Sequence, residues 1–398
     1  MRRAACISIL VAACALPASG SSAPAAAADG FPVYAVTGGM GDAWISRRNP
    51  RTLGQLGRAV PLGQWEFVNG LSPDGSLAAL VAANARPVSL RFLDVERMRW
   101  GRTVELPYWS AARWVAPRTL AVLGEHADGL RAAIVDAEDG RIVRETRIAG
   151  HLEGRYAEPA PAGAALLLSP PTFRFMGPVL LGVIRPTGAV RVVEISRILS
   201  GFAQRARRPG LIADPSTSRA YVFGGLDEPV AEVDLRTLKV KYHTLLGPRP
   251  LAGTLGAERF GAWLAPGRIA IGGWDDSMTD TLRLGVSLVD TKTWRLRRID
   301  RDADFFAKSG DLLLTLHMDG SLAAFGLDGR RRFSVGKQVF SLGTLASNGR
   351  YVYAYNLSPG LKGSALVVDA TAGGALSWSQ APPFGSVLSP GLVVLPGA

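Results

Sequence analysis

Short runs of aliphatic and β-branched residues alternate with short polar turns along almost the whole chain. The clearest example is the turn Leu71-Ser72-Pro73-Asp74-Gly75, which leads into the apolar run 76–81. A further run, 88–93, ends at a turn that begins with Asp94, and another short run, 102–106, follows it. Apolar runs of about four to eight residues between such turns are typical of β-strands. The pattern therefore predicts an all-β chain.

The turn led by Asp or a similar residue recurs along the chain and divides it into similar units. Eight copies are found, with spacings between 38 and 56 residues, and they begin at Asn49, Asp94, Asp136, Pro186, Asp234, Asp290, Asp328 and Asp369. Units of this length with four short strands are the repeats of β-propeller blades. Duplication of one unit also explains why Trp114-Val115-Ala116-Pro117 resembles Trp263-Leu264-Ala265-Pro266.

The two ends of the chain are predicted to complete one blade together. Residues 33–36, 43–46 and 58–62 supply three strands, while 386–390 and 392–395 supply inner-strand candidates at the other end. Joining the ends removes the exposed edges of an open sheet. We therefore expect a single β-propeller domain over 29–398, with eight four-stranded blades and with seven as the alternative.

One segment departs from the strand pattern. Ile195, Ile198, Leu199 and Phe202 have the i, i+3, i+4, i+7 spacing of an amphipathic helix. We expect a short helix there, either packed on the ring or acting as a docking element.

The turn Leu71 to Gly75, the strand after it and the later Asp94 turn resemble the repeats of YVTN-type and WD40-like bacterial propellers. The resemblance extends over most of 31–398 in period, but only that one turn matches the motif well. The Gly-His and Trp-Asp signatures of WD40 repeats are absent. The resemblance implies a fold and a tendency to bind other molecules, and it carries over no catalytic residue.

The first 28 residues have the pattern of an export signal followed by an Ala-rich spacer. Met1-Arg2-Arg3 precedes a short apolar stretch, and Ala26-Ala27-Ala28 is the best cleavage site. The alternative is a lipobox, Val11-Ala12-Ala13-Cys14, which would leave a lipid anchor on Cys14. Both cysteines, Cys6 and Cys14, lie in this segment, so we expect a mature domain without disulfides. The expected location is secreted, periplasmic or at the cell surface.

The chain is strongly basic, with a net charge of +12 and a pI of about 10.2. The cations are mostly Arg and are scattered along the chain, and no aromatic residues are interleaved with them as in nucleic-acid-binding stripes. We therefore expect no nucleic acid as partner, and a basic surface attracted to anionic lipid or glycan.

Recognisable catalytic motifs are missing from the sequence. The four histidines are far apart, and no nucleophile elbow, phosphate-binding loop or dinucleotide fingerprint is present. Asp275, Asp276 and Asp280 form a weak Ca²⁺ candidate, but they lack the alternating ligand order of a calcium loop. We expect neither a cofactor nor a metal.

Connection length distinguishes the two faces of the predicted ring. With strands labelled A to D from the axis outward, the A–B and C–D turns are short, whereas the B–C and D–A connections carry the insertions. Those longer connections emerge on one face, and loops on a rigid scaffold often carry function. Aromatic residues and Arg, the usual binding hot spots, gather there. The candidate contact residues are Tyr108, Trp109, Arg155, Tyr156, Phe173, Arg174, Phe175, Arg205, Arg208 and Trp274.

Two functions of different class follow from this reading. The first is an exported, monomeric, non-catalytic scaffold that holds a partner protein or an anionic cell-surface polymer on the face with the long connections. The alternative is an enzyme, either a glycan lyase or hydrolase or a redox subunit like the propeller subunit of amine dehydrogenases. The enzyme would use His151, Glu153, Arg155 and Asp275 around the mouth of the channel.

Overall fold

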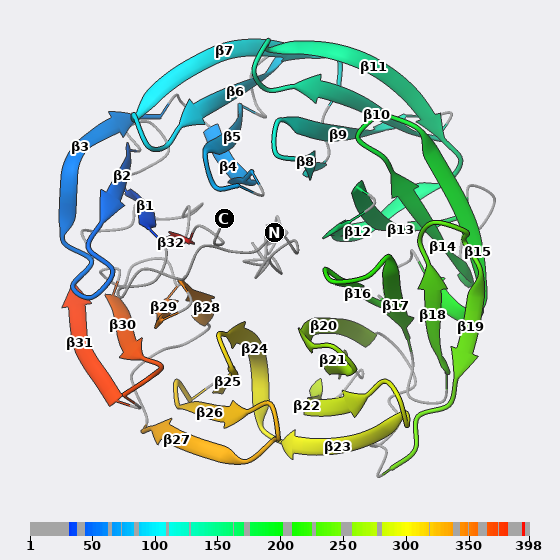
Figure 1. Cartoon of the computed structure of the whole chain (residues 1–398), viewed down its shortest axis with the longest axis vertical. Coiled ribbons are helices and arrows are strands. Elements are labelled where there is room, and N and C mark those ends of the chain that lie inside the picture. The colour runs from blue at the N-terminus through cyan, green and yellow to red at the C-terminus, as the bar shows by residue number, and fades with distance from the viewer. Residues whose placement is uncertain are drawn as a thin grey trace, which may run out of the picture.

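The protein is a ring of four-stranded antiparallel sheets around a central axis (Figure 1). The computed structural model describes residues 32–37, 44–62, 66–72, 74–82, 87–108, 111–126, 129–161, 163–170, 176–201, 209–224, 228–247, 257–276, 281–317, 319–336, 343–348, 350–356, 364–372, 374–380 and 392–394. These residues form eight sheets and contain no helix. The all-β propeller is thereby confirmed, and the number of sheets agrees with the predicted number of repeats.

From the axis outward, the first four sheets have the following strands. Sheet 1 contains β32 (Leu392–Val394), β1 (Val33–Thr37), β2 (Trp44–Arg48) and β3 (Gln55–Pro61). Sheet 2 contains β4 (Glu66–Leu71), β5 (Leu77–Ala82), β6 (Val88–Asp94) and β7 (Arg99–Leu106). Sheet 3 contains β8 (Ala111–Ala116), β9 (Thr119–His126), β10 (Gly129–Asp136) and β11 (Arg141–Ile148). Sheet 4 contains β12 (His151–Ala160), β13 (Gly163–Ser169), β14 (Met176–Ile184) and β15 (Val190–Gly201).

The other four sheets follow the same order. Sheet 5 contains β16 (Gly210–Asp214), β17 (Arg219–Phe223), β18 (Val230–Asp234) and β19 (Val240–His243). Sheet 6 contains β20 (Ala257–Ala265), β21 (Arg268–Asp276), β22 (Thr281–Asp290) and β23 (Arg295–Asp300). Sheet 7 contains β24 (Ala303–Ser309), β25 (Leu312–His317), β26 (Leu322–Gly326) and β27 (Arg331–Val335). Sheet 8 contains β28 (Gly343–Ser347), β29 (Tyr351–Asn356), β30 (Ser364–Asp369) and β31 (Gly374–Gln380).

The recurring turn has a direct physical cause. At Asp136, Asp234 and Asp290 the side-chain Oδ1 accepts hydrogen bonds from the backbone N–H groups two and three residues further on, at 2.8–3.1 Å. Asn49 does the same at 2.9 and 3.0 Å. A short acceptor side chain thus closes the turn between the third and fourth strands. The sequence repeat is therefore a repeat of turn chemistry.

The hydrophobic core is divided among the spaces between neighbouring sheets. Phe92 of sheet 2, for example, lies 5.9 Å from Trp114 of sheet 3, measured between ring centroids, within one buried cluster. A second cluster joins sheets 3 and 4, and a third joins sheets 4 and 5. Strands buried on both faces explain the continuous apolar runs of the inner strands, such as β13.

The predicted helix around Ile195 is wrong, because Ile195, Ile198 and Leu199 belong to the twelve-residue strand β15, whereas Phe202 lies outside the described residues. Val179 lies opposite Ile195, but the preceding Pro178 lies opposite Leu199, so a bulge interrupts the pairing. The bulge turns both Ile195 and Ile198 into the core, where both are fully buried. An i, i+3 apolar spacing therefore arises here from a bulged strand.

The two chain ends meet in sheet 1, as expected. β1 pairs antiparallel with β32, with Val33 opposite Val394 and Ala35 opposite Leu392. The other inner-strand candidate, 386–390, lies outside the described residues. No helix in the described part of the chain has the length and apolar character needed to cross a membrane.

Candidate functional site

The alternation of strand direction places the long B–C and D–A connections on the same face of the ring, which we call the loop-rich face. Several predicted contact residues lie outside the described residues, and so does one of the three predicted Ca²⁺ ligands. They are Trp109, Phe173, Arg174, Phe175, Arg205, Arg208 and Asp280. The backbones of Arg155, Tyr156 and Trp274 are described, but their side chains are not.

Two segments expected to be loops are strands. The stretch 151–159 belongs to β12, the innermost strand of sheet 4, and residues 274–276 belong to β21. Leu152 pairs with Leu168 and Ala157 with Leu166, so 153–156 bulge out of the ladder. The polar residues of these segments were expected in loops. In the structure their backbone is nevertheless part of a strand. Bulges occur preferentially beside functional sites, where they redirect side chains.

A carboxylate holds His151 at the start of this bulged strand. Glu125 Oε2 lies 2.9 Å from His151 Nδ1, and Glu125 Oε1 accepts the backbone N–H of Leu152 at 2.5 Å. Both side chains are 38% exposed. A carboxylate on Nδ1 orients the ring and leaves Nε2 for another partner, the usual arrangement of a general base or metal ligand. Glu125 was not among the predicted residues.

Tyr108 is buried between sheets 2 and 3. It packs over Gly124, where an added Cβ would collide with the ring, and it meets the ring of His126 edge to face at 5.1 Å. Burial raises the pKa of Tyr108 to about 12, with the charge of Glu145 adding to the rise. Neither Tyr108 Oη nor His126 Nε2 has a hydrogen-bond partner within the described ranges, although both atoms are buried.

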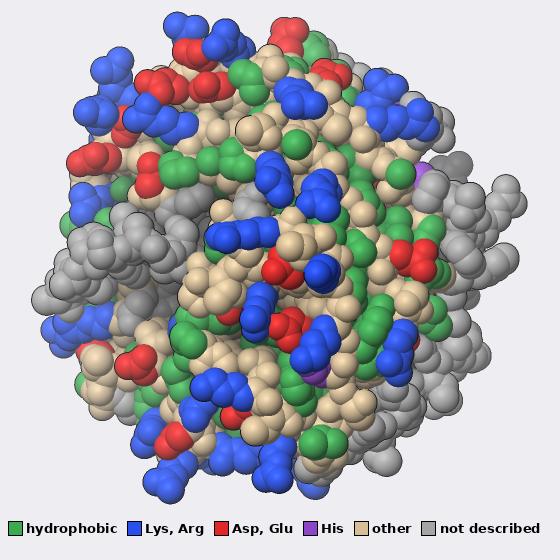
Figure 2. All heavy atoms as spheres, turned by 45° about the vertical axis from the view of Figure 1, so that its right-hand side comes forward, with side chains coloured by type: hydrophobic (Ala, Val, Ile, Leu, Met, Phe, Trp, Pro, Cys, Tyr) green, Lys and Arg blue, Asp and Glu red, His purple; other side chains and the backbone are tan. Residues whose placement is uncertain are grey.

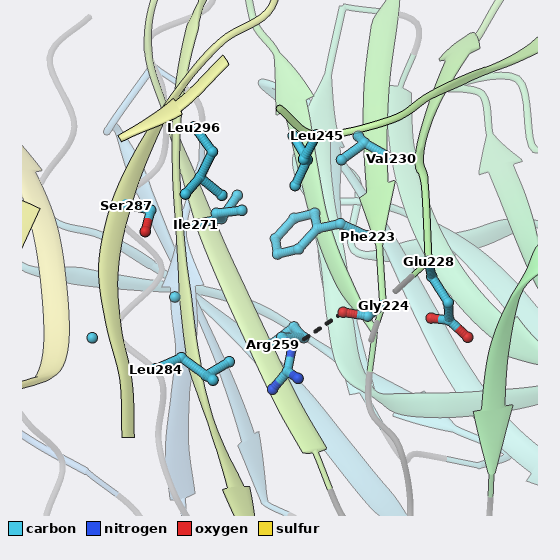
Figure 3. A pocket seen from close by; sticks show the side chains of 12 residues that line it. Phe223, Gly224, Glu228, Val230, Leu245, Arg259, Ile271, Leu284, Ser287 and Leu296 are labelled. Atoms are coloured by element: carbon cyan, nitrogen blue, oxygen red, sulfur yellow. Dashed lines mark hydrogen bonds between the residues drawn. The ribbon is translucent and has the colours of Figure 1, made fainter. Parts of the chain in front are cut away.

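A small pocket with a volume of about 30 Å³ lies between sheets 5 and 6 (Figure 3). One end is apolar and is lined by Phe223, Val230, Leu245, Ile271 and Leu296. At the other end, Arg259 and Leu284 line the pocket and Glu228 stands across from them. The pocket thus combines an apolar wall with one cation and one carboxylate.

The pocket exists because sheet 6 has glycines, which carry no side chain, where it faces sheet 5. Arg259, Gly273 and Gly285 form one row across β20, β21 and β22, and the neighbouring row contains Gly272. Gly285 has a φ of 63°, in the left-handed region that glycine tolerates. Phe223 lies against Gly261, where an added Cβ would collide with the aromatic ring. Glycines therefore leave the space for the pocket and allow Phe223, its aromatic wall, to pack closely against sheet 6.

Arg259 is the most unusual residue of the pocket, because it is a cation that is only 4% exposed. Its Nε donates to the carbonyl oxygen of Gly224 across the two sheets at 3.1 Å. Glu228 Oε1 accepts the backbone N–H of Leu199 in β15 at 3.2 Å, so it links sheets 4 and 5. Sequence reasoning missed both residues. For Arg259, the available signal was a charged residue directly before the apolar segment 260–264.

The enzyme candidates lie on two sheets. His151, Glu153 and Arg155 are on β12 in sheet 4, whereas Asp275 is on β21 in sheet 6, with sheet 5 between them. Asp275 and Asp276 lie at the end of β21. No group of three or more His, Cys, Asp or Glu in the described part of the chain is arranged to hold a metal ion.

Comparison with known proteins identifies the fold. No family model matches the chain, and no curated protein matches it. Among solved structures, dihydro-heme d1 dehydrogenase NirN in complex with DHE is 14% identical with a TM-score of 0.59, covering 91% of this chain and 76% of that one. Apo AztD from Citrobacter koseri is 13% identical with a TM-score of 0.54, covering 93% and 99%. A eukaryotic initiation factor is 12% identical with a TM-score of 0.51, covering 89% and 85%. At these identities the similarity shows a propeller-like fold and no more.

Proposed function

We propose that this protein is an exported, non-catalytic scaffold that binds a partner through its loop-rich face. The eight sheets are taken as its complete set of blades, in a repeat protein of the YVTN or WD40-like kind. Export is supported by the basic and apolar pattern of residues 1–28. A rigid ring with its longer connections on one side is a suitable support for a binding surface.

The observation that carries this proposal is the pocket between sheets 5 and 6. Its lining is mainly apolar, and it contains the buried Arg259 together with Glu228. Small apolar pockets with a few fixed polar groups anchor single side chains at interfaces. Between the two predicted partner classes, this lining favours a protein segment that inserts an apolar side chain over an anionic polymer.

The proposal is tested by native mass spectrometry of the protein purified from its own source. We expect a second polypeptide bound to the wild type. The triple variant Trp109→Ala, Tyr156→Ala and Trp274→Ala, and separately the pocket-filling variant Ser287→Leu, should lose it. Ser287 lines the pocket and is buried, so the added side chain occupies the hollow.

The matched control changes two exposed cations on the opposite face, Arg97→Ala and Arg118→Ala. This control should retain the partner. Retention of the partner by both the triple variant and the pocket variant, or loss by the control alone, would show that the site has been wrongly assigned.

The Glu125–His151 pair favours the enzyme as second candidate. Its geometry is that of an oriented base. If catalysis occurs there, His151→Gln should abolish turnover of a glycan while leaving the partner bound. Unchanged turnover in that variant would remove this candidate.

A further inference from the structure

The positive charge of this protein is concentrated on the outermost strand of each sheet. The eight outermost strands, β3, β7, β11, β15, β19, β23, β27 and β31, together contain fourteen Lys and Arg against four Asp and Glu. The remaining described strands contain eleven Lys and Arg against fifteen Asp and Glu. The outer circumference is therefore strongly basic, whereas the inner strands are slightly acidic.

These strands form the outer edge of the ring (Figure 1). We call the Lys and Arg residues on them the basic rim. Seven of the eight outermost strands contribute to it, and only β31 has no Lys or Arg. In Figure 2 the blue side chains form separate groups over the visible surface and around its outline, with fewer red carboxylates between them. The rim is thus a distributed belt and not one compact patch.

Four arginines of the rim are held in place without being neutralised. Arg102, Arg144 and Arg191 donate from Nη1 to the backbone carbonyls of Asp139, Thr187 and Arg236, at 3.1, 3.3 and 2.7 Å. Arg297 donates in the same way to the carbonyl of Asp328. Each bond reaches the turn between the third and fourth strands of the next sheet along the ring.

A carbonyl acceptor orients a guanidinium but leaves its charge uncompensated. None of these four arginines forms an ion pair with a carboxylate in the described part of the chain. A guanidinium has five N–H donors, so the remaining donors can bind an anion, and the side chain loses less entropy because it is already ordered. The rim therefore presents pre-organised cations at the same place on successive sheets.

Protection of sheet edges explains why the outer strands are charged, but not why they are rich in Arg. Charged side chains on an edge strand, above all Lys, discourage pairing with another molecule, whereas thirteen of the fourteen cations here are Arg. A ratio of fourteen cations to four anions needs a second cause. An anionic partner supplies it.

We propose that the basic rim binds a flexible, linear, densely anionic polymer that follows the circumference of the ring. A flexible chain that follows the outer strands can reach cations on several sheets at once. The inference goes beyond the proposed function, because it uses a different surface and a different class of partner from the loop-rich face.

The test measures binding of the full chain to inorganic polyphosphate and to dextran sulfate, each in short and long forms, at several salt concentrations. We expect affinity to rise with polymer length and to fall steeply with salt as counterions are released. The variant Arg102→Gln, Arg144→Gln and Arg297→Gln should bind at least tenfold more weakly. Its slope of log affinity against log salt should be shallower by about 2, because three contacts are lost.

The matched control removes three cations from the turns on the opposite side from the loop-rich face, through Arg97→Gln, Arg118→Gln and Lys292→Gln. These residues are exposed and lie outside the outermost strands. The control changes the net charge equally and should retain most of the affinity. Glutamine keeps an N–H donor for the carbonyl bond, and circular dichroism checks that the rim variant is folded.

Three results would overturn the proposal. The first is equal loss of affinity in the rim variant and its control, which would reduce the effect to net charge. The second is affinity that does not depend on polymer length, which would indicate a compact site. The third is stronger binding to vesicles with about one-third anionic lipid than to either polymer.

Preference between polyphosphate and dextran sulfate identifies the type of anion. The rim variant leaves the loop-rich face unchanged. A negative result in this polymer-binding test would therefore not bear on the proposed function.

Discussion

At the scale of single residues, polar side chains that fix local geometry explain most of the sequence repeat. His317 shows how far such networks extend. Its Nε2 lies 2.9 Å from Asp300 Oδ2 and its Nδ1 lies 2.7 Å from Ser321 Oγ, while Thr315 Oγ1 donates to the same Asp300 oxygen at 2.5 Å. This network ties the end of sheet 6 to sheet 7. The sequence suggested no role for His317, because its carboxylate partner is on another sheet.

This network predicts a pH-dependent stability. The hydrogen bond to Asp300, together with nearby carboxylates, raises the pKa of His317. Burial opposes ionisation of Asp300, but the hydrogen bonds from His317 and Thr315 outweigh it and lower the pKa of that carboxyl. The contribution of His317 is therefore complete below its unfolded pKa of about 6.5 and is lost as pH rises through its folded pKa. The contribution of Asp300 is present above about pH 4 and is lost as pH falls.

The variant His317→Gln keeps a hydrogen-bonding group but cannot carry a charge. We expect its free energy of unfolding in urea to be lower than that of the wild type by about 1 kcal/mol near pH 5.5. The difference should shrink as the pH rises from about 6.5 through the raised folded pKa of His317, where the wild-type ring loses its proton. A difference that stays constant from pH 5 to pH 9 would contradict this account.

Gly163 is a position at which only glycine fits. Its φ is 127°, and an added Cβ would collide with the carbonyl oxygen of Ile184 on the adjacent strand β14. Gly163→Ala should therefore lower the free energy of unfolding by more than about 2 kcal/mol. Gly101→Ala is the matched control, since a Cβ there would lie 3.4 Å from the nearest atom, and its effect should stay within about 0.5 kcal/mol.

At the scale of strands and sheets, bulges account for most of what sequence patterning could not predict. Strand alternation and turn residues were sufficient for the inner strands of most units. The bulges in β12 and β15 break the two-residue period, so one segment was expected to be a loop and the other a helix. The pocket was also not predictable, because it depends on glycines of β21 and β22 lying in register with Arg259 of β20.

The carbonyl-bound arginines should join neighbouring sheets. Arg144→Ala removes the bond to Thr187 O, and we expect it to lower the free energy of unfolding by about 1 kcal/mol. Arg141→Ala, on the same strand, removes only an exposed ion pair with Asp139 and should change it by less than about 0.5 kcal/mol. Equal effects in the two variants would mean that the bond between sheets contributes nothing of its own.

At the scale of the whole molecule, stability depends on joining the first and last strands. Deleting residues 392–398 removes β32 and exposes the edge of β1. The truncated protein should melt at a lower temperature and should be cut by trypsin within sheet 1, at Arg47 or Arg58. A shorter deletion of 395–398 leaves β32 in place and should behave like the wild type. Identical trypsin resistance in both truncated proteins would contradict closure through β32.

Function is the level at which the sequence was least informative. The period of the turns predicted the ring and the face with the long connections, because both follow from local chemistry repeated along the chain. Glu125, Glu228 and Arg259 gain their significance only through partners on neighbouring strands and sheets, which no spacing along the chain encodes.

Hydrogen–deuterium exchange of the protein, with and without its co-purified polypeptide partner, tests the central claim most directly. We predict that the partner slows exchange in the B–C and D–A connections and at the adjoining ends of β12 and β21. Exchange in the short turns of the opposite face should be unchanged. Protection centred on those short turns, or no protection on any connection of the loop-rich face, would contradict the account.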